Sequence, residues 1–240
     1  MSTKIKSPNE KSNGFLWALL AVLLIAAVIV GYIFMSNQGS KIDKVTEGIE
    51  KTDVTFDMAI KDNAYQLKSN KATDSTPQVD LYEDFSCPHC ADLAIATDAD
   101  MLKAIDAGEL VVNVRTLHFL DGGKTDGHST RAGDALMIAA QQGDANLYWN
   151  FRDMLMKKQA DIYAKWNMQD FADAARQVGA SEETAKKIAE SPADHAAAVA
   201  MFKANEDKLK TETGKVSSPR IIKDGKDIDD LQNWVAEAKK

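Results

Sequence analysis

Cysteine is almost absent from this chain of 240 residues, which contains two cysteines and five prolines. A small secreted scaffold held together by several disulfides is therefore excluded. The composition, with 45% hydrophobic and 27% charged residues, is that of a globular protein of one large domain or two small ones. The two cysteines, Cys87 and Cys90, lie three positions apart. Because a bridge that closes so short a loop removes little entropy from the unfolded chain, the pair is not architectural.

Long hydrophobic runs are also lacking, with one exception at residues 15–35, FLWALLAVLLIAAVIVGYIFM. This uncharged run has the roughly 20 residues that a helix needs to cross a bilayer, so it predicts one transmembrane helix. Residues 1–14 form a tail with three lysines, which favours a cytoplasmic N-terminus and an extracytoplasmic remainder. A cleaved secretory signal is the alternative, but its apolar region is usually shorter, and no A-x-A-like site follows. Residues 36–52 are polar and are predicted to form a linker.

An excess of positive charge is missing as well. The formal net charge is −7 at neutral pH, which argues against nucleic acid as a partner. An extracytoplasmic domain lies in an oxidising compartment, where idle thiols become disulfides. A sequence that keeps a single close pair of cysteines avoids wrong pairings there.

The order of the predicted elements places the cysteines at the start of a helix. Residues 79–85, VDLYEDF, are rich in β-forming residues and predict a strand. Pro88 suits the first position of a helix that continues to about residue 107. A second β-forming run follows at residues 110–120. This β-α-β order predicts two parallel strands with the helix packed across them.

The remaining sequence predicts more sheet and a block of helices. A hairpin that turns at Asp62-Asn63 precedes the first of these strands. Apolar stripes with helical spacing run through the middle of the chain, and Ser191 and Pro192 are interpreted as the cap and first turn of a further helix. We expect helices over residues 128–213, a strand at 219–222 and a terminal helix from about 229 to 238.

The helical positions of the two cysteines predict different chemistry for each. Residues i and i+3 of a first turn are neighbours, so the pair can form or break a disulfide with modest adjustment. Cys87, at the cap, faces the unpaired amides and the positive end of the helix dipole, whereas Cys90 lies one turn inside. A thiolate is therefore favoured on Cys87, and a cationic or hydrogen-bonding His89 acts in the same direction. We expect Cys87 to be the exposed nucleophile and Cys90 the resolving thiol.

The hexapeptide FSCPHC after a β-strand resembles the active site of DsbA-family thiol oxidoreductases of the thioredoxin superfamily. The resemblance implies an α/β, thioredoxin-like fold that is interrupted by a helical domain. The core is then formed by residues 53–127 and 214–240, and the helical insertion by residues 128–213. The resemblance also implies a cis-proline loop at Ser218 and Pro219 that faces the dithiol.

The same resemblance implies the activity and the partners. The chain is expected to be a protein-disulfide oxidoreductase with no cofactor other than its own redox-active disulfide. The single span is similar to that of membrane-tethered members from Gram-positive bacteria, including the actinobacterial MdbA type. The implied partners are exported, unfolded proteins with free thiols and a membrane re-oxidase, DsbB-like or VKOR-like.

Two positions depart from the family pattern. Family members often carry a buried acid six positions before the first cysteine, where this sequence has Leu81. Glu83 and Asp84 are nearby acids, but neither occupies that position, and neither is assigned a catalytic role. Ser218 stands before the proline where the family often has Val or Thr, so the oxidising strength is left open.

Two other classes of function remain open from the sequence. A disulfide isomerase or reductase would use the same residues and differ only in reduction potential. A dedicated redox chaperone or metallochaperone is a binding module, but a metal would need more ligands than one CxxC supplies. His118, His128 and His195 lie too far along the chain to predict a shared site, so no metal site is expected. We interpret them as a half-buried strand residue, a loop residue and a solvated helix residue, respectively.

Overall fold

The computed structural model describes residues 14–240, and these fall into two compact units with the boundary between Lys41 and Ile42. Helix α1, Gly14–Thr46, runs through the boundary between them. Among the helices with described side chains, none is both long and apolar enough to cross a membrane. The side chains of residues 15 and 32–41 are not described, so this finding covers only part of the predicted span at residues 15–35. The predicted tail at 1–14 lies outside the described residues apart from Gly14.

The predicted linker at residues 36–52 is not a free polar chain throughout. Helix α1 continues to Thr46, and Ile42 is only 1% exposed. Val45 and Ile49 follow at helical spacing and pack against the same core, which explains why a largely polar segment is ordered. The Thr52 amide then donates to Asn150 Oδ1 at 2.7 Å, so the second half of this segment belongs to the folded domain.

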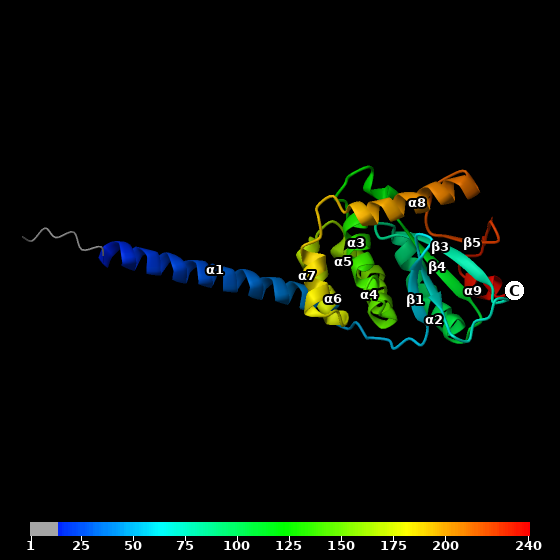
Figure 1. Cartoon of the computed structure of the whole chain (residues 1–240), viewed down its shortest axis with the longest axis horizontal. Helices are drawn as coiled ribbons and strands as arrows, with labels where there is room; N and C mark the ends of the chain where they lie inside the picture. Colours follow the sequence, from blue (N-terminus) through cyan, green and yellow to red (C-terminus); the bar gives the residue numbers. More distant parts are fainter. Residues whose placement is uncertain (1–13) are drawn as a thin grey trace, which may run out of the picture. The chain divides into compact units, whose positions relative to one another are not determined.

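The sheet of the domain has the strand order β1-β2-β4-β3-β5-β6 (Figure 1). Within the described residues, β3 and β4 are the one pair of parallel strands, and helix α2 connects them as the β-α-β pattern predicts. The predicted hairpin turns at Asp62 and Asn63, both with positive φ, and its first strand begins at Asp57. The elements are β1 Asp57–Lys61, β2 Ala64–Lys68, β3 Gln78–Asp84, α2 Pro88–Asp106, β4 Val111–Leu117, β5 Arg220–Lys223 and β6 Lys226–Asp227.

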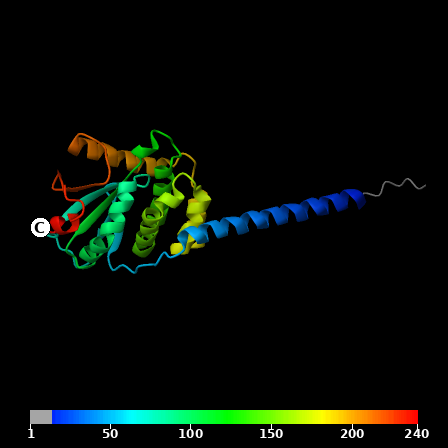
Figure 2. The same cartoon turned by 180° about the vertical axis from the view of Figure 1, so that it is seen from behind.

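Both faces of the central strands are covered, because successive side chains of a strand point to opposite faces. Leu81 of β3 lies in the larger hydrophobic cluster, to which α2 contributes, and Figure 2 shows α2 across the sheet from behind. Tyr82 lies in a smaller cluster with Leu209 of α8, on the opposite face. Strand β4 is accordingly buried at every position.

Six helices lie between β4 and β5 in the described chain, and they run from His128 to Thr213. Most of them gather beside the β1 edge of the sheet, whereas α8 lies along the sheet itself (Figure 1). They are α3 His128–Ala140, α4 Ala145–Lys157, α5 Gln159–Ile162, α6 Met168–Val178, α7 Glu182–Ala189 and α8 Ala196–Thr213, with a 3-10 turn η1 at Phe119–Asp121 before them and α9 Trp234–Ala238 at the end.

Two predicted helix starts are wrong. Ser191 does not cap α8, because its hydroxyl donates to Asp134 Oδ2 at 2.5 Å and the chain turns once more before the helix begins at Ala196. The terminal helix begins at Trp234 rather than 229. The carboxylate of Asp230 accepts hydrogen bonds from the amides of Gln232 and Asn233 and closes a turn there.

Helix α3 is capped from outside its own segment. The carboxylate of Asp121 accepts hydrogen bonds from the amides of Ser129 and Thr130, at 3.0 and 2.8 Å, and from the Thr130 hydroxyl at 2.7 Å. Gly127, the N-cap residue, leaves room for this carboxylate, because a Cβ there would overlap it.

Gly127→Ala is therefore expected to destabilise the domain by about 2–3 kcal/mol, through overpacking and loss of the cap. Denaturant unfolding of the two proteins measures the difference. Asp121→Ala provides the cross-check, since it should cost clearly less in the Gly127→Ala background than in the wild type. Additive effects would contradict the steric explanation.

Candidate active site

The cysteine pair lies at the junction between the end of β3 and the start of α2. Strand β3 ends at Asp84, whose carbonyl accepts the Cys87 amide at 2.9 Å. Cys87 has extended backbone angles at the N-cap of α2, and Pro88 is the first helical residue. Both cysteines are free thiols. The local sequence thus produces the strand, turn and helix that the CxxC motif predicts.

Cys87 lies in an environment that stabilises its thiolate. The pKa of Cys87 is lowered to about 5, chiefly by a hydrogen bond from the Cys90 thiol, while burial acts in the opposite direction. The backbone amides of Cys90 and His89 and the Ser218 side chain add to the lowering of this pKa. These amides belong to the first turn of α2, as the helix-terminus argument predicts.

Cys90 has the opposite shift. Burial raises the pKa of the Cys90 thiol, and the neighbouring Cys87 thiolate raises it further. The two sulfurs titrate as a pair, so the first proton leaves the pair easily and the second does not. The arrangement therefore holds one negative charge, on the sulfur at the helix cap.

The cis-proline loop covers the pair. The Ser218–Pro219 peptide bond is cis, as the family resemblance implies. The Cys87 sulfur lies 3.5 Å from the Ser218 carbonyl oxygen, to which it donates a hydrogen bond when it is protonated. The Ser218 hydroxyl is buried and has no partner of standard geometry in the described part of the chain, yet it lowers the pKa of both thiols. Ser218 therefore offers the sulfurs an uncommitted hydroxyl donor.

Two expectations about this pair need correction. Cys87 was expected to be exposed, but it is 5% exposed and Cys90 is 3%, and the Ser218 carbonyl lies against the Cys87 sulfur. The charge on the sulfur therefore distinguishes the two thiols, and their exposure does not. The His89 imidazole is 83% exposed and lies 3.8 Å from Asp92, so His89 acts on Cys87 through its backbone amide.

A buried ion cluster lies next to Cys90. Arg152 of α4, which is 1% exposed, donates to both carboxylate oxygens of Glu83, at 2.9 and 2.6 Å. Its remaining nitrogen donates to Asp98 of α2 at 2.6 Å. Burial raises the pKa of Asp98 to about 6 although Arg152 opposes this. A cavity of about 10 Å³ is lined by all three of these residues together with Cys90 and Pro219.

Glu83 was recognisable in the sequence as a nearby acid, but its two partners were not predicted. Asp98 shares a helix face with Cys90 at a spacing of eight residues, which is a signal that could have found it. Arg152 has no such signal. Leu81, at the position of the expected acid, lines the same cavity as an apolar residue.

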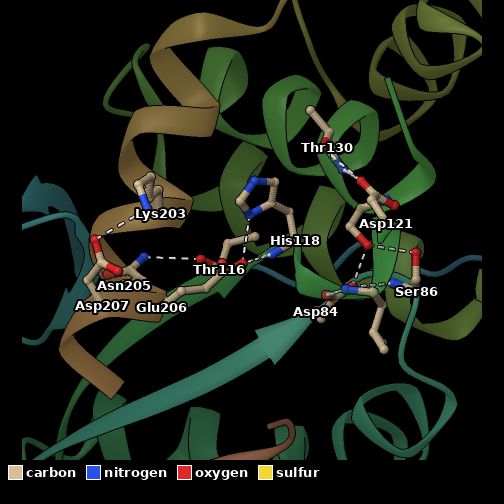
Figure 3. A network of polar contacts seen from close by, with 12 residues as sticks. Asp84, Ser86, Thr116, His118, Asp121, Thr130, Lys203, Asn205, Glu206 and Asp207 are labelled. Atoms are coloured by element: carbon tan, nitrogen blue, oxygen red, sulfur yellow. Dashed lines mark hydrogen bonds and ion pairs between the residues drawn. The ribbon is translucent and has the colours of Figure 1, made fainter. Parts of the chain in front are cut away.

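Asp84 is the centre of a second polar network (Figure 3). Its carboxylate accepts the Ser86 amide at 2.8 Å, the Ser129 hydroxyl at 2.5 Å and the Leu120 amide at 3.2 Å. Burial raises the pKa of Asp84 to about 6, against these hydrogen bonds. The network joins the residue before Cys87 to the loop after β4 and to α3.

The histidines are dispersed, and two of them differ from expectation. His118 is half-buried as expected, one residue beyond β4, where a hydrogen bond to Glu206 raises its pKa (Figure 3). His128 is the first residue of α3 and is buried, which lowers its pKa to about 4. His195 is also buried, because its ring bonds Asp134 at 2.9 Å.

No group of three or more histidine, cysteine or acidic side chains is placed to hold a metal ion in the region with described side chains.

Comparison with known proteins agrees with this geometry. The sequence profile of the family described as Thioredoxin matches residues 72–237. A search of curated proteins finds no match. Among solved structures, MdbA, a thiol-disulfide oxidoreductase from Corynebacterium diphtheriae, is 46% identical, with a TM-score of 0.76 over 79% of this chain and 96% of that one.

Two further structures show the range of the likeness. MdbA from Corynebacterium matruchotii is 40% identical, with a TM-score of 0.76 over 85% of this chain and 98% of that one. Oxidised DsbA from Mycobacterium tuberculosis is 18% identical, with a TM-score of 0.56 over 73% and 91% of the two chains, and is similar in fold alone. The chain therefore belongs to the thioredoxin family and, within it, to the DsbA- and MdbA-like thiol-disulfide oxidoreductases.

Proposed function

We propose that this protein-disulfide oxidoreductase is an extracytoplasmic disulfide donor that passes the Cys87–Cys90 disulfide to exported, unfolded proteins. The opposite shifts of the two thiols carry the proposal, since the pKa of Cys87 is lowered to about 5 and that of Cys90 is raised. A stabilised thiolate favours the reduced enzyme, so the enzyme disulfide is readily given away. A reductase would need the reverse preference.

The exchange proceeds in two steps. A substrate thiolate attacks the Cys87 sulfur of the oxidised enzyme, and Cys90 leaves and takes up a proton, because burial raises its pKa. A second substrate thiolate then attacks the substrate sulfur of this mixed disulfide, and Cys87 leaves as a stable thiolate. The substrate loses two electrons and gains a disulfide, while the enzyme becomes a dithiol. Pro219 and Ser218 flank the Cys87 sulfur and are the proposed contact for the substrate chain.

We further propose that residues 15–35 anchor the enzyme in the membrane with its domain outside the cytoplasm. The run is uncharged, and its described large apolar side chains between Leu16 and Val30 are exposed. Contiguous exposed apolar surface is typical of membrane or protein contact. Because each donated disulfide leaves two electrons on the enzyme, a membrane re-oxidase, DsbB-like or VKOR-like, is the proposed second partner.

A Cys90→Ala variant tests the proposed roles. Without the resolving thiol, mixed disulfides between Cys87 and substrates should accumulate, and non-reducing electrophoresis with mass spectrometry should identify many exported proteins. The matched Cys87→Ala variant should trap none. Trapping through Cys90 in the Cys87→Ala variant would reverse the two roles, and a single trapped client would favour the dedicated chaperone.

The direction of electron flow needs a separate measurement. A reduction potential near the roughly −120 mV of a strong thiol oxidant is expected. A potential near or below about −270 mV, as in thioredoxin, would instead support the reductase alternative.

A further inference from the structure

The peptide that carries the attacked sulfur is held from the helical insertion. Gln159, the first residue of α5, donates its side-chain amide to the Phe85 carbonyl at 2.9 Å and to the Cys87 carbonyl at 3.0 Å. Gln159 is 5% exposed, so these bonds form away from water. One side-chain amide has two N–H donors, and both are used on the two carbonyls that flank Ser86.

The Cys87 carbonyl is also the first acceptor of α2. It receives the Cys90 amide at 3.0 Å and the Ala91 amide at 3.3 Å. Gln159 therefore binds the group from which the first turn of α2 begins. The amides of that turn, those of His89 and Cys90, act on the Cys87 sulfur. Because hydrogen bonds weaken steeply as they bend, a rotation of this peptide would remove part of their effect.

A second contact from the insertion holds the residue between the two carbonyls. The Ser129 hydroxyl of α3 lies 2.6 Å from the Ser86 hydroxyl and also donates to Asp84. The turn at residues 85–87 is thus held from two helices. Helix α5 binds the carbonyls of Phe85 and Cys87, and helix α3 binds the side chain of Ser86. Burying a glutamine and aligning it with two carbonyls costs conformational entropy. The two hydrogen bonds that hold the Cys87 peptide account for a glutamine at this buried position.

We infer that Gln159 is a positioning residue for Cys87, which holds from the helical insertion the peptide that carries the attacked sulfur. The inference rests on the proposed role of Cys87. It gives the helical insertion a part in positioning the sulfur at which the redox chemistry takes place.

The test replaces the amide by a side chain of equal length without a donor, Gln159→Met, in the full-length chain. The pKa of Cys87, followed by ultraviolet absorbance of the thiolate, should rise by about one unit. The equilibrium constant for oxidising glutathione should fall about tenfold, which corresponds to about 30 mV for a two-electron couple. An unchanged Cys87 titration in folded Gln159→Met would overturn the inference.

Asn150→Leu is the matched control. Asn150 is buried and also donates its amide to two carbonyls, those of Thr52 and Asn146, away from the cysteine pair. The Asn150→Leu substitution should lower the unfolding temperature and leave the pKa of Cys87 unchanged. An equal shift in both variants would mean general loosening and would overturn the inference.

A shorter variant covers the case in which Gln159→Met does not fold. Gln159→Asn keeps the donors but brings them one methylene short of the carbonyls, and the Cys87 pKa should again rise. The absence of such a rise would also overturn the inference. Failure of the proposed function is recognised separately, because wild-type Cys87 would then titrate near its usual value of about 8.5 and trap no substrate.

Discussion

Replacing Arg152 with methionine is expected to destabilise the domain by about 3–5 kcal/mol, the usual consequence of removing one partner of a buried ion cluster. Arg152 is the cation that binds Glu83 and Asp98, and all three side chains are buried. The methionine fills most of the volume, so the loss comes from two uncompensated carboxylates rather than from a cavity. Urea unfolding with an unchanged m-value measures the difference.

The loss should shrink as the pH falls from 7 towards 5. Burial already raises the pKa of Asp98 to about 6 in the wild type, and removal of its cation raises it further. A carboxyl whose folded-state pKa lies above its unfolded value binds more protons in the folded state, so stability increases as the pH falls through that range. A deficit that does not depend on pH would indicate lost packing instead.

Arg176→Met is the matched control. Arg176 pairs with Asp173 and Glu182 at the surface, and such pairs contribute about 1 kcal/mol or less. A comparable loss in both variants would contradict the assignment of Arg152 to a buried cluster. Replacing Arg152, Glu83 and Asp98 together by apolar residues should recover much of the stability, because no charge is then left unpaired.

Local features of this fold could be predicted from the sequence. The β-forming residues before Cys87, Pro88 at the first helical position and the turn at Asp62-Asn63 each act within a few residues. Their physical causes, backbone preference and helix capping, are contained in the sequence window itself. The order of strand, CxxC and helix was therefore predictable, and with it the different environments of the two thiols.

The partners of the site could not be predicted in the same way. Arg152 reaches Glu83 across 69 positions of sequence, and Gln159 reaches Phe85 across 74. Such contacts depend on how α4 and α5 pack against the start of α2, which no local pattern encodes. Ser191 shows the reverse error, because a good capping residue is bound instead by Asp134, 57 positions away. Tertiary contacts determine the hydrogen-bond partners of these residues.

The reduced enzyme is expected to hold a thiolate on Cys87 at a pH where ordinary cysteines are protonated. The pKa of Cys87 is lowered to about 5, whereas that of an ordinary cysteine is about 8.5. Thiolate absorbance of the Cys90→Ala variant and of the wild type, titrated between pH 3 and 9, measures this directly. Cys87 of the variant should titrate at a higher pH, because the hydrogen bond from the Cys90 thiol makes the largest contribution to the low pKa of Cys87.

The rate of alkylation tests the ionisation of Cys87 independently. The dependence of this rate on pH is informative, whereas its value at pH 7 is not. At pH 7 an ordinary thiol is only a few per cent ionised, so full ionisation speeds Cys87 about 30-fold. Intrinsic nucleophilicity falls with pKa at a Brønsted slope of about 0.4–0.5, which over this range slows the thiolate by a similar factor. The two effects nearly cancel at pH 7. Cys87 should therefore react at a rate that is constant above pH 6, whereas a normal thiol accelerates tenfold per unit up to about pH 8, and a profile of the second kind would rule out the stabilised thiolate on which disulfide donation depends.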